Sequence, residues 1–178
     1  MLFRSQIKNE VGVDVGAFLS KLENDSGLIR RKVPIFESEK TKRSVYEIGD
    51  CFFRSWFRFV WKNMYLRELQ RFDVMRGYAA RDYEVFSGYA LEQYFAWKFI
   101  EEKKYTRMDA WWDRKGENEI DLVCDDEVAN KLDFYEVKRD VSRIDLHDLE
   151  RKSGVFFAKN PKFKSRKCFF KGLSLEDM

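Results

Sequence analysis

Two short strand-like segments joined by a polar run constrain the fold of this chain more than any other feature. The segments are Glu119–Cys124 and Asp133–Lys138, and the run Asp125–Lys131 between them is mostly polar. Segments of this kind around a polar connection predict an antiparallel hairpin. With the hairpin centred between Val128 and Ala129, residues whose numbers sum to 257 face each other, which sets the register of the whole pair.

This register predicts a cluster of charged side chains. Residue 121 faces 136 and residue 119 faces 138, and side chains directly opposite each other share a face of the sheet. That face would carry Glu119, Asp121, Glu136 and Lys138, with Ile120, Leu122 and Val137 pointing into the core behind it. Carboxylates this close repel unless a cation neutralises them, and oxygen ligands suit Mg²⁺. The alternative is a solvated hairpin with cross-strand ion pairs, which contribute little to stability.

The segments around the hairpin predict a mixed α/β layer. A helix begins near Asp82, and Glu92 lies among aromatic side chains on it. Met108–Trp112 has the character of another strand, Asp145–Ala158 that of a helix, and Lys167–Gly172 that of a last strand. The order helix, three strands, helix, strand is typical of helices packed on a mixed sheet.

The first part of the chain has the outline of a shortened winged helix. Val13–Asn24 carries apolar residues at a helical period, and two strands follow, joined by a polar turn with Lys40, Lys42 and Arg43 at its tip. A complete winged helix has about three helices, but only a short stretch, Leu2–Asn9, precedes this one. Residues 1–50 hold nine basic and eight acidic side chains, so a packing role is favoured over DNA binding.

Aromatic side chains, which make up 17% of the chain, concentrate in the next segment. Asp50 can cap a helix that continues to Met64, and Phe52, Trp56 and Trp61 cover more than one of its faces. We expect this helix to be buried and shared between the winged-helix remnant and either the C-terminal domain or a second copy of the chain. The charged stretch 67–81 is predicted to be a connection. The expected organisation is therefore 1–66, 67–81 and 82–178.

Basic residues gather near the C-terminus although the net charge is only +3. From Arg151 to Gly172 there are eight Lys or Arg residues and no Asp or Glu, with phenylalanines between them. This pattern is typical of a phosphate-binding surface, and equally of a solvated helix and loop. We expect the stretch to flank the acidic cluster. The candidate nucleic-acid contacts are Lys162, Lys164, Arg166 and Lys167, together with Arg114 and Lys115 before the hairpin.

Several function classes are disfavoured by composition. The three cysteines are widely separated and odd in number, which fits neither a disulfide framework nor a zinc site. The single histidine, His147, disfavours a multi-histidine metal site. There is no phosphate loop of the ATPase type, no membrane-spanning apolar run and no signal peptide. We therefore expect a cytoplasmic protein without nucleotide on this chain and without contact with a membrane.

An aspartate followed by E-x-K on the adjacent strand, with a glutamate on the preceding helix, resembles the pattern of the PD-(D/E)XK nuclease superfamily. The resemblance is carried by Glu92, by "EIDLV" around Asp121 and by "YEVKRD" around Glu136 and Lys138. The whole chain also resembles the C-terminal part of archaeal-type STAND/AAA ATPases, which occur in bacteria too. In that family a winged-helix region leads into a nuclease-like domain of unassigned function. The matching stretches are "YEIGDCFFRSWFRFV", "FSGYALEQYF", "WWDRKGENEIDLV", "FYEVKRD" and "GLSLEDM".

The resemblance implies an α/β (α+β) chain, with a truncated winged helix followed by a restriction-endonuclease-like mixed sheet flanked by helices. It implies Mg²⁺ or Mn²⁺ held by Asp121, Glu136 and Glu92, with Lys138 as the catalytic lysine and Glu119 as an accessory residue. The implied activity is metal-dependent cleavage of DNA. The alternative is a non-catalytic DNA- or protein-binding regulatory module. Because the ATPase domain is missing from this sequence, an ATPase in cis or in trans is the implied partner.

Overall fold

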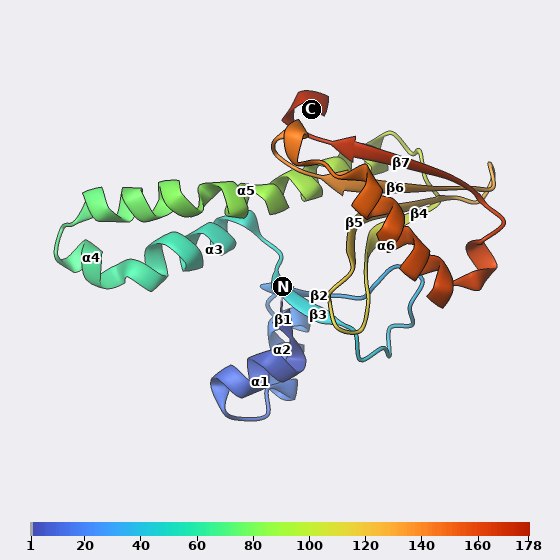
Figure 1. The fold of residues 1–178 in the computed structure, drawn as a ribbon. Helices are drawn as coiled ribbons and strands as arrows, with labels where there is room; N and C mark the ends of the chain where they lie inside the picture. Colours follow the sequence, from blue (N-terminus) through green and yellow to red (C-terminus); the bar gives the residue numbers. More distant parts are fainter. Residues whose placement is uncertain (1) are drawn as a thin grey trace. The chain divides into compact units, whose positions relative to one another are not determined.

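The computed structural model describes residues 2–178, which form two compact units (Figure 1). Unit 1 holds residues 2–33 and 37–86, and unit 2 holds Pro34–Phe36 and Ser87–Met178. Each unit has its own sheet. The described chain is therefore a mixed α/β protein, as the order of segments in the sequence predicts.

Unit 1 begins with two helices packed beside a small antiparallel sheet. The elements are β1 (Leu2–Phe3), α1 (Arg4–Val11), α2 (Gly16–Asn24), β2 (Ile29–Lys32) and β3 (Val45–Ile48). The strands lie in the order β1-β3-β2, with both pairs antiparallel. The second helix and the hairpin were expected from the sequence. The two-residue strand β1, which precedes the first helix and pairs with β3, was not expected.

A helical hairpin completes unit 1. Its first arm is α3 (Cys51–Ser55), a π-helical turn (Trp56–Val60), a 3₁₀ turn (Trp61–Asn63) and α4 (Met64–Glu68), and its second arm is the start of α5 (Phe72–Glu101). Asp50 caps the first arm, because its Oδ1 accepts a hydrogen bond of 2.9 Å from the amide of Phe53. The second arm covers one side of the first, as Phe59 contacts Phe86 with ring centroids 5.1 Å apart.

The aromatic helix is only partly covered within a single chain, because Phe52, Phe57 and Trp61 are exposed. That a second copy shares this helix stays a prediction. Most of the stretch 67–81 is helical, since α5 runs without interruption from Phe72 to Glu101 and passes from unit 1 to unit 2 at Ser87. Charged residues without proline are good helix formers, so a charged stretch alone does not indicate a linker. No helix of the described range, α5 included, has the length and apolarity needed to cross a membrane.

Unit 2 is built on a four-stranded mixed sheet. The strands are β4 (Arg107–Trp112), β5 (Glu119–Asp126), β6 (Lys131–Val137) and β7 (Lys167–Leu173), in the order β4-β5-β6-β7. The first three are antiparallel, and β7 runs parallel to β6 after the crossover helix α6 (Leu146–Lys159). Short 3₁₀ turns lie at Val141–Arg143, Pro161–Phe163 and Leu175–Asp177. All four strands and the helix before β7 agree with the sequence prediction.

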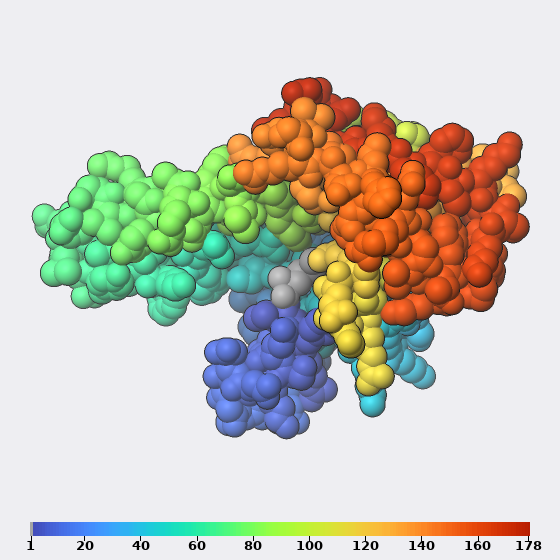
Figure 2. All heavy atoms as spheres, in the orientation of Figure 1, coloured from blue at the N-terminus to red at the C-terminus, as the bar shows by residue number. Residues whose placement is uncertain are grey.

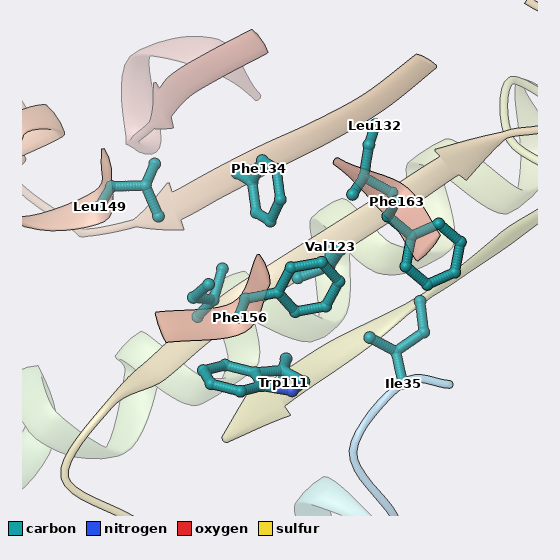
Figure 3. Close-up of a cluster of buried hydrophobic side chains, with 9 residues drawn as sticks. Ile35, Trp111, Val123, Leu132, Phe134, Leu149, Phe156 and Phe163 are labelled. Carbon is teal, nitrogen blue, oxygen red and sulfur yellow. The ribbon is translucent and has the colours of Figure 1, made fainter. Parts of the chain in front are cut away.

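Both faces of this sheet are covered by apolar side chains. On one face α6 contributes Leu149 and Phe156, which pack on the sheet residues Trp111, Val123 and Phe134 (Figure 3). On the other face α5 packs through Leu91, Phe95 and Phe99 against a row of strand residues, namely Leu122, Cys124, Tyr135, Val137 and Leu173. The sheet is therefore a layer between two helices, which fixes the direction of every side chain along its strands.

The connection between β2 and β3 contributes three residues to unit 2. The amide of Ile35 donates a hydrogen bond of 2.9 Å to the carbonyl of Ala110 on the edge strand β4, and the Ile35 side chain is buried in the core against α6 (Figure 3). Phe36 contacts Phe163 with ring centroids 4.2 Å apart. Pro34–Phe36 is therefore an integral part of the core of unit 2.

Candidate active site

The hairpin formed by β5 and β6 has the register expected from its sequence. Leu122 faces Tyr135 and Val123 faces Phe134, and every pair in the ladder sums to 257. The short polar turn and the alternation of apolar residues determine this register. A slip of one residue would turn each apolar side chain to the opposite face of the sheet.

A β-bulge interrupts the pairing of β5 with its other neighbour, β4. Asp109 faces Val123, but Trp111 faces Ile120, so that Asp121 and Leu122 together lie opposite the single residue Ala110. As a result Ile120 lies in the core against α6 and Leu122 in the core against α5. The expectation that both point into one core is wrong. A bulge bends the strand and redirects a side chain, and the redirected residue here is Asp121.

Three of the candidate residues converge where β5 leaves β6. Oδ2 of Asp121 accepts a hydrogen bond of 2.7 Å from the backbone amide of Val137. The Nζ atom of Lys138 lies 3.5 Å from the same oxygen and 3.0 Å from Oε1 of Glu136. Asp121, Glu136 and Lys138, three of the four charged residues that the hairpin arithmetic places on one face, therefore lie together. The predicted convergence of Glu92 on the same point stays a prediction.

The second carboxylate is held by the start of helix α6. Oε2 of Glu136 accepts a hydrogen bond of 3.2 Å from the amide of Asp145, which caps α6. Ile144 packs on Gly172, the residue beside Glu136 in the parallel pair with β7, and a Cβ at position 172 would lie 2.6 Å from Cδ1 of Ile144. The absence of a side chain at Gly172 thus allows Ile144 to sit where Asp145 reaches Glu136.

The site is partly desolvated, and this changes its proton affinities. Burial raises the pKa of the Asp121 carboxyl above its ordinary value, and the nearby Glu136 raises it further. Burial lowers the pKa of Lys138, but the two carboxylates outweigh it, so that the pKa of Lys138 lies above its ordinary value. At neutral pH Lys138 is therefore a cation and a hydrogen-bond donor, not a base.

The donor atoms suit a hard cation held by few protein ligands. Mg²⁺ is commonly bound by one or two carboxylates, with water and phosphate oxygens completing its octahedron. Asp121 and Glu136 supply two such carboxylates, and an added positive charge would offset the cost of burying Asp121. Within residues 2–178, no three or more His, Cys, Asp or Glu side chains form a ready metal-binding group. Lys138 is the cation between the two carboxylates in this structure.

The two remaining acidic candidates lie on neighbouring elements. Glu92 is half-buried on α5, directly after Leu91, which packs in the same core as Val137 and Leu173. Glu119 is exposed at the start of β5, opposite Trp112, and the bulge separates it from Asp121. Their participation stays a prediction.

The four basic candidates near the C-terminus do not flank this site as expected. Arg151 at the start of the basic stretch does lie at this end of the sheet, because its Nη1 donates a hydrogen bond of 2.9 Å to Oδ1 of Asn118, just before β5. Lys167 begins β7 and pairs with Lys131, whereas Gly172, five residues on, pairs with Glu136. At about 3.3 Å per residue, Lys167 lies about 16 Å away along the strand, and Lys162, Lys164 and Arg166 precede it. Arg166 is also engaged internally, in an ion pair with the buried Asp125. The parallel crossover is the reason, since it starts β7 at the far end of the sheet.

The other two basic candidates lie at the correct end. Arg114 and Lys115 are exposed in the turn between β4 and β5, which projects from unit 2 (Figures 1 and 2, yellow). Asp113 holds this turn by accepting hydrogen bonds from the amides of Lys115 and Glu117, at 3.0 and 3.1 Å, and from the side chain of Asn118 at 2.6 Å. Two cations are thus presented beside the start of β5.

Sequence reasoning missed the groups that orient the carboxylates. Two are the backbone amides of Val137 and Asp145. Almost every residue has a backbone amide, so the sequence does not show which amides will bind a carboxylate. The third is Gly172, and here a signal existed, because glycine inside a strand often marks the close approach of another segment. Asp145 was expected at the start of a helix, although its amide bond to Glu136 was not.

Comparison with known proteins places the chain among uncharacterised relatives. It is 34% identical over 164 residues to the uncharacterized protein MJECL04 of Methanocaldococcus jannaschii, an alignment that covers 83% of this chain and 36% of that protein. The chain thus spans about a third of the length of the curated relative it matches. No solved structure matches it. Residues 56–149, which include the hairpin and its three converging side chains, match the DUF234 family, described as archaeal and bacterial proteins of unknown function. The chain therefore belongs to the DUF234 family.

Proposed function

We propose that unit 2 is a metal-dependent phosphodiesterase domain that acts on DNA. The observation that carries the proposal is the convergence of Asp121, Glu136 and Lys138 at one end of the sheet, with both carboxylates oriented by backbone amides. Two carboxylates and a lysine fixed in this way are the groups that hydrolysis of a phosphodiester needs near one point.

Each side chain has a distinct part in this proposal. Asp121 and Glu136 would hold Mg²⁺ or Mn²⁺, which when bound polarises the phosphodiester and lowers the pKa of a coordinated water. The amides of Val137 and Asp145 keep the two carboxylates in place without a metal. Lys138, which is protonated at neutral pH, would turn from the carboxylates to an oxygen of the phosphate and offset its negative charge.

The position of the site also suggests where DNA would pass. The exposed Arg114 and Lys115 lie in the turn that leads into β5. A strand that crosses the end of the sheet would meet these two cations before it reaches Asp121. Following the resemblance to the C-terminal part of STAND/AAA ATPases, we propose that an ATPase domain in cis or in trans controls access to the site.

A second candidate is a non-catalytic regulatory module of such an ATPase. It is favoured by one observation, that Lys138 is ion-paired with both carboxylates and so neutralises the cluster without a metal. In this case the same residues would serve to stabilise the end of the hairpin.

Nuclease assays on linear, branched and single-stranded DNA, with Mg²⁺ or Mn²⁺, distinguish the two. The phosphodiesterase proposal expects cleavage that chelator abolishes and that Asp121→Asn and Lys138→Ala each reduce by at least about a hundredfold. Asp126→Asn is the matched control. Asp126 lies at the other end of β5, and its Oδ1 also accepts a backbone amide hydrogen bond, from Ala129. Equal activity in all variants would mean that another nuclease is present and would exclude this site.

A further inference from the structure

The first arm of the helical hairpin in unit 1 carries a large apolar side chain at every fourth residue on its outer side. These five residues, the outer stripe, are Phe53, Phe57, Trp61, Tyr65 and Leu69. Their exposed fractions are 38, 43, 61, 54 and 67% respectively. Positions four apart occupy successive turns of a helix, so the five side chains form a continuous row. A row of exposed aromatic residues on a folded helix needs an explanation, because single exposed residues are normal and rows are not.

The outer stripe is not required to hold the hairpin together. The inner side of the same arm does so, through Phe59 against Phe86, the buried Leu66, and an ion pair of 3.2 Å between Arg58 and Asp82 on α5. The two arms run side by side, with the first arm in teal and the start of α5 in green (Figure 1). The contacts that join the two arms therefore come from the inner side of the first arm and not from the stripe.

Two irregular turns set the direction of the stripe. In a regular α-helix each step of four residues turns about 40° beyond a full circle, so Leu69 would lie about 160° from Phe53. The π turn at Trp56–Val60 inserts one extra residue, which removes about 100° of this drift, and the 3₁₀ turn at Trp61–Asn63, with three residues per turn, adds about 60°. The stripe therefore spans about 120° of the helix circumference, less than in a regular α-helix.

The area of the stripe is more than half of what one partner of a standard protein interface buries. An aromatic side chain can bury about 150–250 Å², and about half of each stripe residue is exposed, which gives roughly 500 Å² of apolar surface. The exposed Phe52 on the same arm and Phe72 at the start of α5 add further apolar surface. A standard protein interface takes about 800 Å² from each partner, and its centre is rich in aromatic residues.

We propose that the outer stripe is the surface through which two copies of this chain associate. The simplest closed arrangement of two copies has a two-fold axis and uses the same surface on both. With the axis at Trp61, the middle of the stripe, the two helices run antiparallel. Phe57 of one copy then lies against Tyr65 of the other, and Phe53 against Leu69. None of the five positions carries a charge, so none is left buried and unpaired in this arrangement.

Light scattering of the full chain at several concentrations, with Trp61→Glu as the test variant, decides the proposal. The wild-type chain is expected to show a concentration-dependent dimer, and Trp61→Glu to weaken its association by at least about thirtyfold, as expected for a central aromatic residue. Because Trp61 is exposed in the single chain, the circular dichroism spectrum of the variant should not change, and its melting temperature should equal that of the wild type at concentrations where both are monomeric.

Trp97→Glu is the matched control. Trp97 lies on α5 in unit 2 and is 61% exposed, as Trp61 is, but it is not part of the stripe. Its variant should dimerise like the wild type. A wild-type chain that stays monomeric at every concentration would overturn the proposal, as would a dimer that both variants weaken equally. Loss of binding to lipid vesicles or to an ATPase domain in Trp61→Glu, with the oligomeric state unchanged, would assign the stripe to a different partner.

Discussion

Asp121 and Val137 are joined by a hydrogen bond of 2.7 Å from the backbone amide of Val137 to the carboxylate of Asp121, at the point where β5 and β6 separate. The carboxylate takes the place of the carbonyl that a regular ladder would offer to this amide. The bulge opposite Ala110 turns Asp121 toward β6. The position of Asp121 in the site therefore depends on the pairing of β5 with both β4 and β6.

Replacing Asp121 with Asn should leave the fold intact. The Oδ1 atom of asparagine can accept the same hydrogen bond from Val137, so the free energy of unfolding should stay within about 1 kcal/mol of the wild-type value. Urea unfolding at neutral pH measures the difference. A loss of several kcal/mol would show that the negative charge of Asp121, and not its hydrogen bond, holds the hairpin end.

The same variant should change how stability depends on pH. Because the pKa of Asp121 is raised in the folded chain, the folded state binds more protons than the unfolded state between the ordinary pKa, about 3.9, and the raised value. Its contribution therefore falls as pH rises through this window. The wild-type chain should lose stability there relative to Asp121→Asn, and parallel pH profiles of the two proteins would contradict the burial of this carboxyl.

Gly172→Ala should destabilise unit 2 and loosen the hold on Glu136. The new Cβ would overlap with Ile144, a type of overpacking that usually costs about 1–3 kcal/mol. It would also move the amide of Asp145, whose chemical shift and hydrogen exchange can be followed by NMR. The double variant Gly172→Ala, Ile144→Ala should restore the amide signal. Failure of the double variant to do so would mean that the overlap with Ile144 is not the cause.

Asp113→Ala should destabilise the turn that presents Arg114 and Lys115. The variant loses three hydrogen bonds to a carboxylate, with an expected cost of about 1.5–3 kcal/mol. Although burial opposes it, the hydrogen bonds from Asn118 and three backbone amides keep the pKa of Asp113 below its ordinary value. Its contribution is thus present above about pH 3.9 and lost as pH falls through the lowered pKa. Acid unfolding should therefore begin at a higher pH in the variant, and coincident acid transitions would refute the role of Asp113.

Ile35→Ala should destabilise unit 2, although Ile35 belongs to the connection between two strands of unit 1. Its side chain is buried with Trp111 and Phe163, and truncation of a buried isoleucine costs about 2–5 kcal/mol. The exposed Val128 is a suitable control, since Val128→Ala should change the free energy of unfolding by less than about 0.5 kcal/mol. Equal effects of the two variants would show that Pro34–Phe36 does not belong to the core of unit 2.

The fold of unit 2 was largely predictable because its sequence signals are local. The alternation along β5 and β6 and the polar turn between them fix the register, which ends with the pair of Leu122 and Tyr135. Asp121 and Glu136 are the next residues beyond that pair. The bulge could not be predicted, since it depends on how β4 pairs with β5. The distance of Lys167 from the site could not be predicted either, because a basic run in the sequence does not show at which end of the sheet it starts.

The direction of the aromatic side chains of unit 1 could not be predicted, for a different reason. Phe59 contacts Phe86 on α5, whereas Phe57 and Trp61 are exposed. Phe57 and Phe59 both lie in the π-helical turn, which shifts the helical phase by one residue. A regular period of 3.6 residues, on which the sequence prediction rests, does not contain that shift.

Calorimetric titration of the full chain with Mn²⁺ alone, without DNA, tests most directly whether the end of the β5–β6 hairpin is a cation site. We expect binding of one ion to the wild-type chain, the same binding to Asp126→Asn, and no detectable binding to Asp121→Asn with its fold retained. Affinity should increase with pH as the Asp121 carboxyl loses its proton. Mn²⁺ binding that persists unchanged in Asp121→Asn, or a wild-type chain that binds no ion, would contradict the account.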